Sequence, residues 1–105
     1  MELSQLRAFL TVAREGNLTR AAQQLHLTQP AVSLQIKALQ QSLKVQLFLR
    51  TPTGMTLTSD GAKLLPLAER VISGSVELMH AAQALNSTLS GHLAIGTILD
   101  PEFTR

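Results

Sequence analysis

Apolar residues in the first part of the chain recur at helical spacing. Leu6, Phe9, Leu10 and Ala13 stand at positions i, i+3, i+4 and i+7, which predicts an amphipathic helix with one buried face. Gly16 follows at the place where a left-handed helix C-cap is usual. The pattern therefore predicts a first helix that ends close to Gly16.

A second, shorter helix is predicted directly after this glycine. Asn17 and Thr19 are both candidate N-caps for it, because each side chain can accept a hydrogen bond from a free N–H of the first turn. Ala22 is small enough to let a neighbouring helix approach closely. The apolar positions of this helix are Ala21, Ala22 and Leu25.

A third helix is predicted to begin after Thr28 as N-cap, with Gln29 first and Pro30 second. In a helix interior the proline would cost about 3 kcal/mol, whereas in the first turn its missing N–H has no intrahelical partner to lose. The buried seam is predicted at Val32, Ile36, Leu39 and Leu43. The remaining front carries Gln29, Pro30, Ser33, Leu34, Lys37, Gln40 and Gln41. A short helix, a tight turn and a second helix with a polar outward front indicate a helix-turn-helix.

Two β-prone runs follow the third helix. Residues 47–51 and 55–58 are separated by the turn sequence "PTG", which predicts a small β-wing. Two strands alone would be marginal in water, so we expect the helices to support them.

The next segment is predicted to be one long helix, from Asp60 with Ser59 as its cap to Leu89. An acid in the first turn suits the helix dipole, and Pro66 is expected to kink the helix. Apolar and small residues alternate at spacings of four and three, a heptad-like seam typical of helix pairing. The seam positions are Leu64, Ala68, Val71, Ser75, Leu78, Ala82, Leu85 and Leu89. This helix would expose too much apolar surface if it packed only on its own small domain.

The last residues, 90–105, are predicted to be a linker followed by a strand at His92–Ile98. A lone strand has no sheet here, so the chain is expected to stop inside a second domain. The fold class predicted from these patterns is mainly α: a winged helix-turn-helix at 1–58, a long linker and dimerisation helix at 59–89, and a hinge with the first strand of a truncated domain at 90–105.

Charge divides the chain into unequal halves. Residues 1–58 hold six Lys and Arg against two Glu, a balance of +4, whereas residues 59–105 hold three against five acids, a balance of −2. Residues 16–59 contain no acid at all. An acid-free basic half favours a polyanionic partner, although a chance distribution in so short a chain explains the charge equally well.

Composition excludes several other classes. The chain has 105 residues, 45% of them hydrophobic, enough to bury the core of one small domain. It has no Cys, so a disulfide framework and a thiolate metal site are excluded. The N-terminus lacks the basic and apolar regions of a signal peptide, and no stretch is long enough to span a membrane. His26, His80 and His92 share no metal-ligand spacing, and no nucleophile and base stand in a recognisable pattern. We therefore predict no metal, no cofactor and no enzyme activity.

The segments "LRAFLTVAREGNLTRAAQQLHLTQPAVSLQIKAL", "LFLR" at Leu47–Arg50 and "LTSDG" at Leu57–Gly61 resemble the N-terminal domain of LysR-type transcriptional regulators. The resemblance runs from about Leu3 to Val71 and more loosely through the long helix. It implies a DNA-binding first domain, a long helix that pairs two subunits, and a small-molecule effector bound only by a C-terminal domain beyond this chain. A cytoplasmic bacterial regulator is expected.

The chain departs from the family pattern at several positions. The family often has Glu at Gln40, Gly at Lys44, and a basic residue at Leu34. A second Arg or Lys often stands in the wing, where this chain has Pro52 and Thr53. These departures leave the fold expectation intact but put a minor-groove contact by the wing in doubt.

With this resemblance, the outward front of the third helix becomes a candidate DNA-reading surface. An amide such as that of Gln29 can bind adenine through two hydrogen bonds, and Ser33 can contact a base or a phosphate. Leu34 either touches a thymine methyl group or is an ordinary exposed leucine, and the sequence leaves both open. The predicted base-contact residues are Gln29, Pro30, Ser33 and Leu34; the predicted DNA-backbone residues are Thr19, Arg20, Thr28, Lys37, Arg50, Thr51 and Thr53. The predicted dimer seam is Leu64, Ala68, Val71, Leu78, Ala82, Leu85 and Leu89.

The function predicted is therefore a sequence-specific transcription regulator that binds an inverted repeat in double-stranded DNA as a homodimer, with a higher oligomer left open for the intact protein. Two alternatives stay open: a non-specific architectural DNA-binding protein on the same fold, and a dimerisation module without DNA binding. The operator, the effector, the regulated genes and the sign of regulation do not follow from the sequence.

Overall fold

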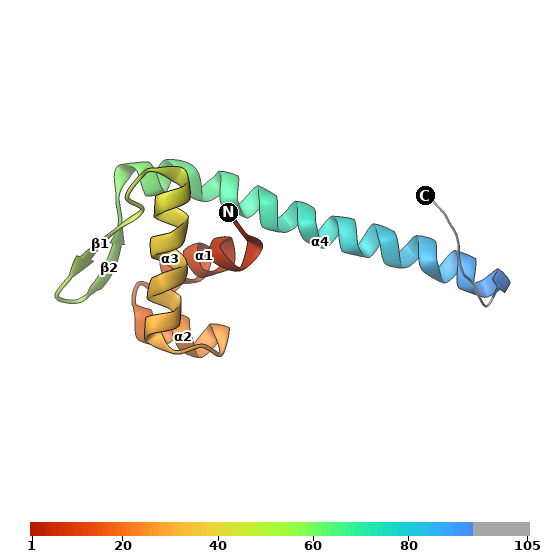
Figure 1. Cartoon of the computed structure of the whole chain (residues 1–105), viewed down its shortest axis with the longest axis horizontal. Coiled ribbons are helices and arrows are strands. Elements are labelled where there is room, and N and C mark those ends of the chain that lie inside the picture. Colours follow the sequence, from red (N-terminus) through yellow and green to blue (C-terminus); the bar gives the residue numbers. More distant parts are fainter. Residues whose placement is uncertain (94–105) are drawn as a thin grey trace. The chain divides into compact units, whose positions relative to one another are not determined.

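The computed structural model describes the backbone of residues 1–93 and the side chains of residues 1–87. The elements are, in chain order, α1 (Leu3–Glu15), α2 (Leu18–Leu25), α3 (Gln29–Leu43), β1 (Phe48–Thr51), β2 (Gly54–Leu57) and α4 (Ser59–Leu93) (Figure 1). The predicted class, a mainly helical fold with a helix-turn-helix, a two-stranded wing and a long helix, is confirmed. Residues 1–72, here called the winged domain, form one compact unit, and the chain from Ser73 onward is a second unit.

The end of the first helix and the start of the second are formed by residues that the sequence favours for these roles. Gly16 adopts a left-handed conformation, with φ of 77°, and its N–H donates to the Val12 carbonyl oxygen at 2.9 Å. The side chain of Asn17 accepts a hydrogen bond from the Arg20 N–H at 2.7 Å. Of the two candidate caps for α2, Asn17 is therefore the cap, and Thr19 lies within the first turn of the helix.

The third helix begins as predicted. The hydroxyl oxygen of Thr28 accepts from the Ala31 N–H at 3.2 Å, Gln29 is the first helical residue, and Pro30 is the second. At the other end Lys44 is the C-cap and adopts the left-handed conformation, with φ of 60°. A Cβ is disfavoured there, so the expectation of a less ideal cap at Lys44 is supported.

The core of the winged domain lies between α1, α2 and α3, with the start of the wing and the first turns of α4 added. The Phe9 and Phe48 rings meet edge to face, with centroids 5.7 Å apart and planes at 83°. Three of the four residues predicted for the α3 seam are buried, and the fourth, Leu43, is partly buried against the core. The largest fully buried side chains are Phe9, Val12, Val32, Leu39 and Leu47.

The wing is a two-stranded antiparallel ribbon that is held against the turn between α1 and α2. Its register pairs Phe48 with Leu57 and Thr51 with Gly54. The Met55 N–H donates to the Gly16 carbonyl oxygen at 2.9 Å. Gly54, with φ of 149°, approaches the same carbonyl so closely that a Cβ would overlap it. The helix-turn-helix and the wing are thus joined through backbone contacts that need glycine at position 54.

The wing begins one residue later than predicted. Leu47 was expected to open the first strand, but it is completely buried and precedes β1. Its carbonyl oxygen accepts from the Thr58 N–H at 3.0 Å, outside the β1–β2 ladder. A period-two pattern cannot distinguish a strand residue from an adjacent core anchor of the same residue type.

The cap of α4 is Thr58, and the prediction of Ser59 was wrong. The Thr58 hydroxyl oxygen accepts from the Gly61 N–H at 2.9 Å, and the hydroxyl donates to the Gln46 carbonyl oxygen at 2.6 Å. Thr58 therefore caps the helix and ties its start to the loop before the wing, whereas Ser59 is the first helical residue. Both residues are good caps by type, so only the tertiary contact with Gln46 decides between them.

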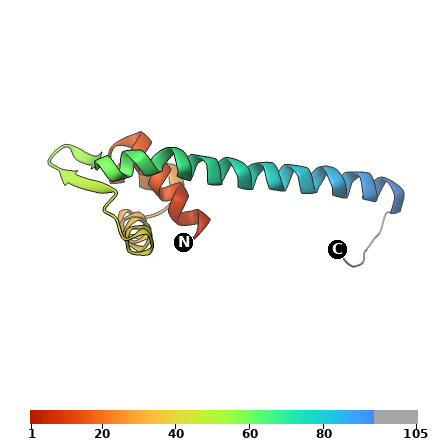
Figure 2. The same cartoon turned by 90° about the horizontal axis from the view of Figure 1, so that it is seen from above.

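Helix α4 runs without interruption through Pro66 and continues to Leu93 (Figure 2). The strand predicted from His92 is wrong for His92 and Leu93, because the backbone there still follows the helix. A helix satisfies its own backbone groups, whereas a strand in this region would need a partner that the described chain does not offer. Residues 94–98 of the predicted strand lie outside the described residues. Within the described part of the chain, no helix has the length and hydropathy that crossing a bilayer requires.

Candidate nucleic-acid interface

The predicted base-contact residues lie along the N-terminal half of α3, at its first turn and on the side away from its buried seam. Val32, Ile36 and Leu39 point into the core, so helix geometry directs the residues about half a turn away from them outward. Leu34 stands close to the centre of that outward face and is 66% exposed. Gln29 and Pro30 are exposed at the N-terminal end, Ser33 is half-buried one turn later, and Lys37 is exposed in the following turn.

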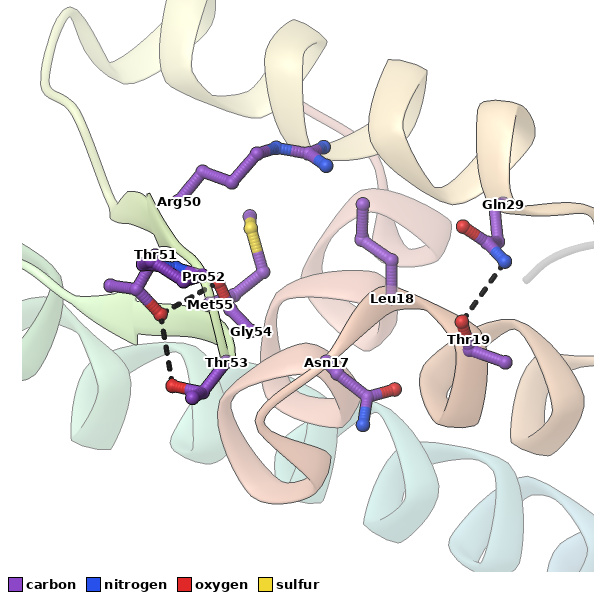
Figure 3. A pocket seen from close by; sticks show the side chains of 10 residues that line it. All are labelled: Asn17, Leu18, Thr19, Gln29, Arg50, Thr51, Pro52, Thr53, Gly54 and Met55. Carbon is purple, nitrogen blue, oxygen red and sulfur yellow. Dashed lines mark hydrogen bonds between the residues drawn. The ribbon is translucent and has the colours of Figure 1, made fainter.

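One contact across the helix-turn-helix was not foreseen. The Gln29 side-chain Nε2 donates a hydrogen bond to the Thr19 Oγ1 at 3.0 Å, and both side chains are exposed (Figure 3). Thr19 belongs to α2 and Gln29 opens α3. Because the two residues are ten positions apart and on different helices, neither capping rules nor periodicity could reveal the contact.

A shallow depression of about 270 Å³ lies between the wing and the start of the helix-turn-helix. Gln29 from α3 and Arg50 from β1 both line it (Figure 3). The other lining residues are Asn17, Leu18, Thr19, Thr51, Pro52, Thr53, Gly54 and Met55. The structure thus brings predicted contact residues from α2, α3 and the wing around one concave surface.

The predicted DNA-backbone threonines differ in what their hydroxyl groups already do. The Thr51 hydroxyl donates to the Gly54 carbonyl oxygen at 3.1 Å and lies 3.4 Å from the Thr53 hydroxyl, so it stabilises the turn of the wing. Thr28 uses its oxygen as a cap acceptor for Ala31, which leaves the hydroxyl proton for another acceptor. Thr53 is exposed at the tip of the wing.

Cations on this side of the winged domain are not neutralised by acids. Arg20, Lys37 and Arg50 are all exposed. The single ion pair in the part of the chain that the structure describes joins Arg14 to Glu15, at 3.8 Å. The helix-turn-helix and the wing therefore present positive charge together with neutral donors and acceptors, a combination that suits a phosphate-bearing partner.

Gln40 does not belong to the outward front, contrary to the prediction. Its side-chain Oε1 accepts hydrogen bonds from the backbone N–H groups of Leu47, at 2.8 Å, and Phe48, at 3.4 Å. The half-buried amide holds the segment between α3 and β1 in place. Helical phase puts Gln40 close to the edge of the seam, and only the folded-back loop supplies the donors that draw it inward.

The predicted dimer seam divides between two environments. Ala68 is 6% exposed and Leu64 is partly buried, and both pack against the core of their own winged domain. Val71, at 44%, Leu78, at 69%, and Leu85, at 67%, are exposed. Ala82 is also exposed, and the side chain of Leu89 lies outside the described residues. No group of His, Asp and Glu side chains that could hold a metal ion occurs among the residues described.

Residues 3–62 match the family model described as bacterial regulatory helix-turn-helix protein, lysR family. An uncharacterised HTH-type transcriptional regulator of Azotobacter vinelandii is 44% identical over 97 residues, which cover 92% of this chain and 67% of that protein. The HTH-type transcriptional regulator CfxR of Cupriavidus necator is 41% identical over 98 residues, covering 93% of this chain but only 31% of that protein.

Solved structures show the same fold. The crystal structure of the CbnR DNA-binding domain in complex with DNA aligns with a TM-score of 0.78 and 35% identity, covering 82% of this chain and 99% of that one. The complex of the BenM DNA-binding domain with benA site 1 DNA aligns with a TM-score of 0.77 and 31% identity, covering 83% and 98%.

Proposed function

Because this chain belongs to the lysR family of bacterial regulatory helix-turn-helix proteins, we propose that it is the DNA-binding region of a transcriptional regulator that recognises a specific duplex sequence. The observation that carries the proposal is the outward face of α3, where neutral hydrogen-bonding side chains stand beside the exposed cation Lys37 and no acid interrupts them. The DNA-binding domains of CbnR and BenM, which have the same fold, were crystallised in complex with DNA, and this supports the proposal.

In the proposed complex the N-terminal part of α3 enters the major groove. Gln29, Ser33 and Leu34 contact base edges there, with Pro30 packed beside them, because the major groove distinguishes all four base pairs by donors, acceptors and the thymine methyl group. Lys37 and Arg50 bind phosphates and set the position of the helix without reading sequence. Arg20 and the hydroxyl groups of α2, α3 and the wing add further phosphate contacts: Thr19, Thr28, Thr51 and Thr53.

We also propose that two copies pair through α4. The exposed apolar residues of this helix, Val71, Leu78 and Leu85 among them, would lose contact with water on pairing. A two-fold dimer presents two recognition helices to two half-sites, so the target would be an inverted repeat with half-sites about one helical turn apart or a small multiple of it. Because the proposed target is double-stranded DNA, we place the protein in the cytoplasm and assign it a binding role rather than a catalytic one.

A small-molecule effector would be bound by sequence that this chain does not contain. The chain spans only about a third of CfxR, and no effector pocket is proposed within it. We therefore expect that adding a candidate effector leaves the DNA affinity of residues 1–105 unchanged.

The test compares a base-reading residue with a phosphate-binding one. Gln29→Ala should weaken binding to a duplex selected by the wild-type chain by about 1–3 kcal/mol and reduce the ratio of selected to scrambled affinity. Lys37→Ala should weaken binding to both duplexes alike and lower the slope of log affinity against log salt by about one. Titrations of both variants on both duplexes at several salt concentrations measure these effects.

The same titrations separate the alternatives. An architectural protein would bind selected and scrambled duplexes equally at a stated salt concentration, and Gln29→Ala would leave that ratio at one. A dimerisation module without DNA binding would bind neither duplex. Either result would contradict the proposed function.

A further inference from the structure

The hydrogen bond between Gln29 and Thr19 has a consequence for which base the interface can read. We infer that Thr19 is a positioning residue: its hydroxyl group holds the Gln29 amide in the orientation that selects adenine over guanine. The inference rests on the proposed function and deepens it, because it assigns a base preference to one named side chain and makes that preference depend on a residue of a different helix.

The geometry limits what the amide of Gln29 can still offer to a partner. Its Nε2 carries two N–H groups, and one of them donates to the Thr19 Oγ1 at 3.0 Å. In the described part of the chain no donor is bound to the Oε1, which is turned away from Thr19 (Figure 3). The exposed amide therefore presents one donor and one acceptor side by side at the N-terminal end of α3.

One donor beside one acceptor matches adenine and opposes guanine. In the major groove adenine offers the N7 acceptor and the N6–H donor, which together accept from Nε2 and donate to Oε1. Guanine offers two acceptors, N7 and O6, so Oε1 would face O6 and repel it. An unrestrained amide could turn by 180° about its last bond and adapt to other base edges. The hydrogen bond to Thr19 opposes this rotation.

The direction of that hydrogen bond is set by what Thr19 does with its own proton. A hydroxyl group can donate or accept, and Thr19 is an exposed residue in the first turn of α2 with a free proton for an outside acceptor. When that acceptor is a DNA phosphate, the hydroxyl donates outward and its lone pair faces Gln29. A series of hydrogen bonds then runs from adenine through the Gln29 amide and the Thr19 hydroxyl to the phosphate. Every donor in this series is matched to an acceptor, and each hydrogen bond polarises the next.

The test uses variants that separate the hydroxyl group from the shape of the side chain. Thr19→Val keeps the branched shape and removes the hydroxyl, whereas Thr19→Ser keeps the hydroxyl. Because Thr19 is exposed and does not cap α2, both variants should melt at the wild-type temperature. Each variant, together with Gln29→Ala and the double variant, is made in the chain of residues 1–105 and used to select duplexes from a randomised library. Single-position affinities are then measured by titration.

The position at which Gln29→Ala abolishes base preference identifies the base that Gln29 reads, and we expect adenine there. At that position Thr19→Val should reduce the adenine-to-guanine affinity ratio about fivefold, as the loss of one neutral hydrogen bond predicts, and Thr19→Ser should retain it. In the Gln29→Ala background Thr19→Val should lower the affinity for all duplexes by a common factor and change no base preference.

Three results would overturn the inference: guanine at the Gln29 position, an unchanged adenine-to-guanine ratio in Thr19→Val, or a loss of preference at every position alike. These are distinguishable from a failure of the proposed function. If the proposed function were wrong, the wild-type chain itself would bind selected and scrambled duplexes equally, or would bind neither of them.

Discussion

The winged domain and residues 73–87 of α4 carry similar apolar patterns and bury them to opposite extents. In the winged domain the periodic residues of α1 and α3, such as Phe9, Val32 and Leu39, are almost completely shielded from water. In residues 73–87 the periodic leucines Leu78 and Leu85 are largely exposed. Periodicity therefore identifies an apolar face but says nothing about what covers it, and the uncovered face is where we propose that a second copy pairs.

The change from buried to exposed apolar residues occurs within a single helix, α4. Leu64, Ala68 and Ile72 of α4 pack against the core of the winged domain, whereas Val71, Leu78 and Leu85 are exposed. The heptad-like spacing continues across this boundary without change. A substitution at a buried seam residue should thus alter the stability of the winged domain, and a substitution at an exposed seam residue should alter the association of two copies.

The largest expected effect is the loss of an aromatic core residue. Phe9→Ala removes a buried ring that packs edge to face on Phe48, and such truncations cost about 3–5 kcal/mol of unfolding free energy. Urea unfolding followed by circular dichroism measures the change. Leu49→Ala, in the exposed outer side of the wing, is the matched control and should shift the unfolding free energy by less than about 0.5 kcal/mol. Equal effects of the two variants would contradict the assigned core.

A charge in the exposed seam should separate the subunits and leave the winged domain folded. Leu78→Asp would bury an unpaired carboxylate in the proposed dimer, at a cost of about 3 kcal/mol or more. Sedimentation at micromolar concentration should show a monomer, with the thermal transition of the winged domain retained. Gln83→Asp adds the same charge on a different side of the same stretch of helix and should leave the dimer intact. A dimeric Leu78→Asp chain would mean that this seam is not the pairing surface.

An intermediate effect is expected at Gln40, inside the winged domain. Gln40→Met keeps the length of the side chain but leaves the N–H groups of Leu47 and Phe48 without their acceptor, at a cost of about 1–3 kcal/mol. Gln40→Glu retains an acceptor oxygen and should stay close to wild type. Urea unfolding measures both, with Gln41→Met on the exposed neighbour as the control. A Gln40→Met chain as stable as that control would exclude a stabilising role for the amide.

The smallest expected effect is a gain in stability. Lys44→Gly removes the Cβ from a residue held at φ of 60° and should raise the unfolding free energy by about 0.5–1 kcal/mol. Gln41→Gly, three positions earlier in the helix, should lower it by about 1 kcal/mol. The two glycine variants change the unfolding free energy in opposite directions only if the Lys44 backbone is strained and Gln41 is helical. Neither variant should change the association of the chain, because both lie in the winged domain.

Local chemistry predicted the elements of the helix-turn-helix because their signals are short-range. Gly16 ends α1, Thr28 caps α3, and Pro30 stands in the first turn of α3, where its missing N–H leaves no intrahelical partner unsatisfied. The predictions for the wing and for the start of α4 were less accurate. Leu47 proved to be a core anchor and Thr58, rather than Ser59, proved to be the cap, because contacts with distant residues decide both roles.

The candidate interface shows the same division. Helical phase placed Leu34 and Lys37 on the outward side of α3, and both are exposed. Gln40 was also predicted for the outward front, but the loop before β1 draws its side chain inward. The contacts of Leu34 and Lys37 with DNA stay predictions until titrations test them. The hydrogen bond from Gln29 to Thr19 gave no signal in the sequence at all.

By itself the sequence determined the end of α1, the start of α3, which helix faces are apolar, and that the helix-turn-helix and the wing carry no acid. Capping, proline geometry and periodicity act within a few residues, and charge is a sum over residue types. Tertiary structure alone decided that Ala68 belongs to the core while Leu78 stays exposed, that Gly54 must meet the Gly16 carbonyl without a Cβ, and that the Gln29 amide donates to the Thr19 hydroxyl oxygen. These are contacts between segments, and they exist only once packing has brought the segments within a few ångströms of one another.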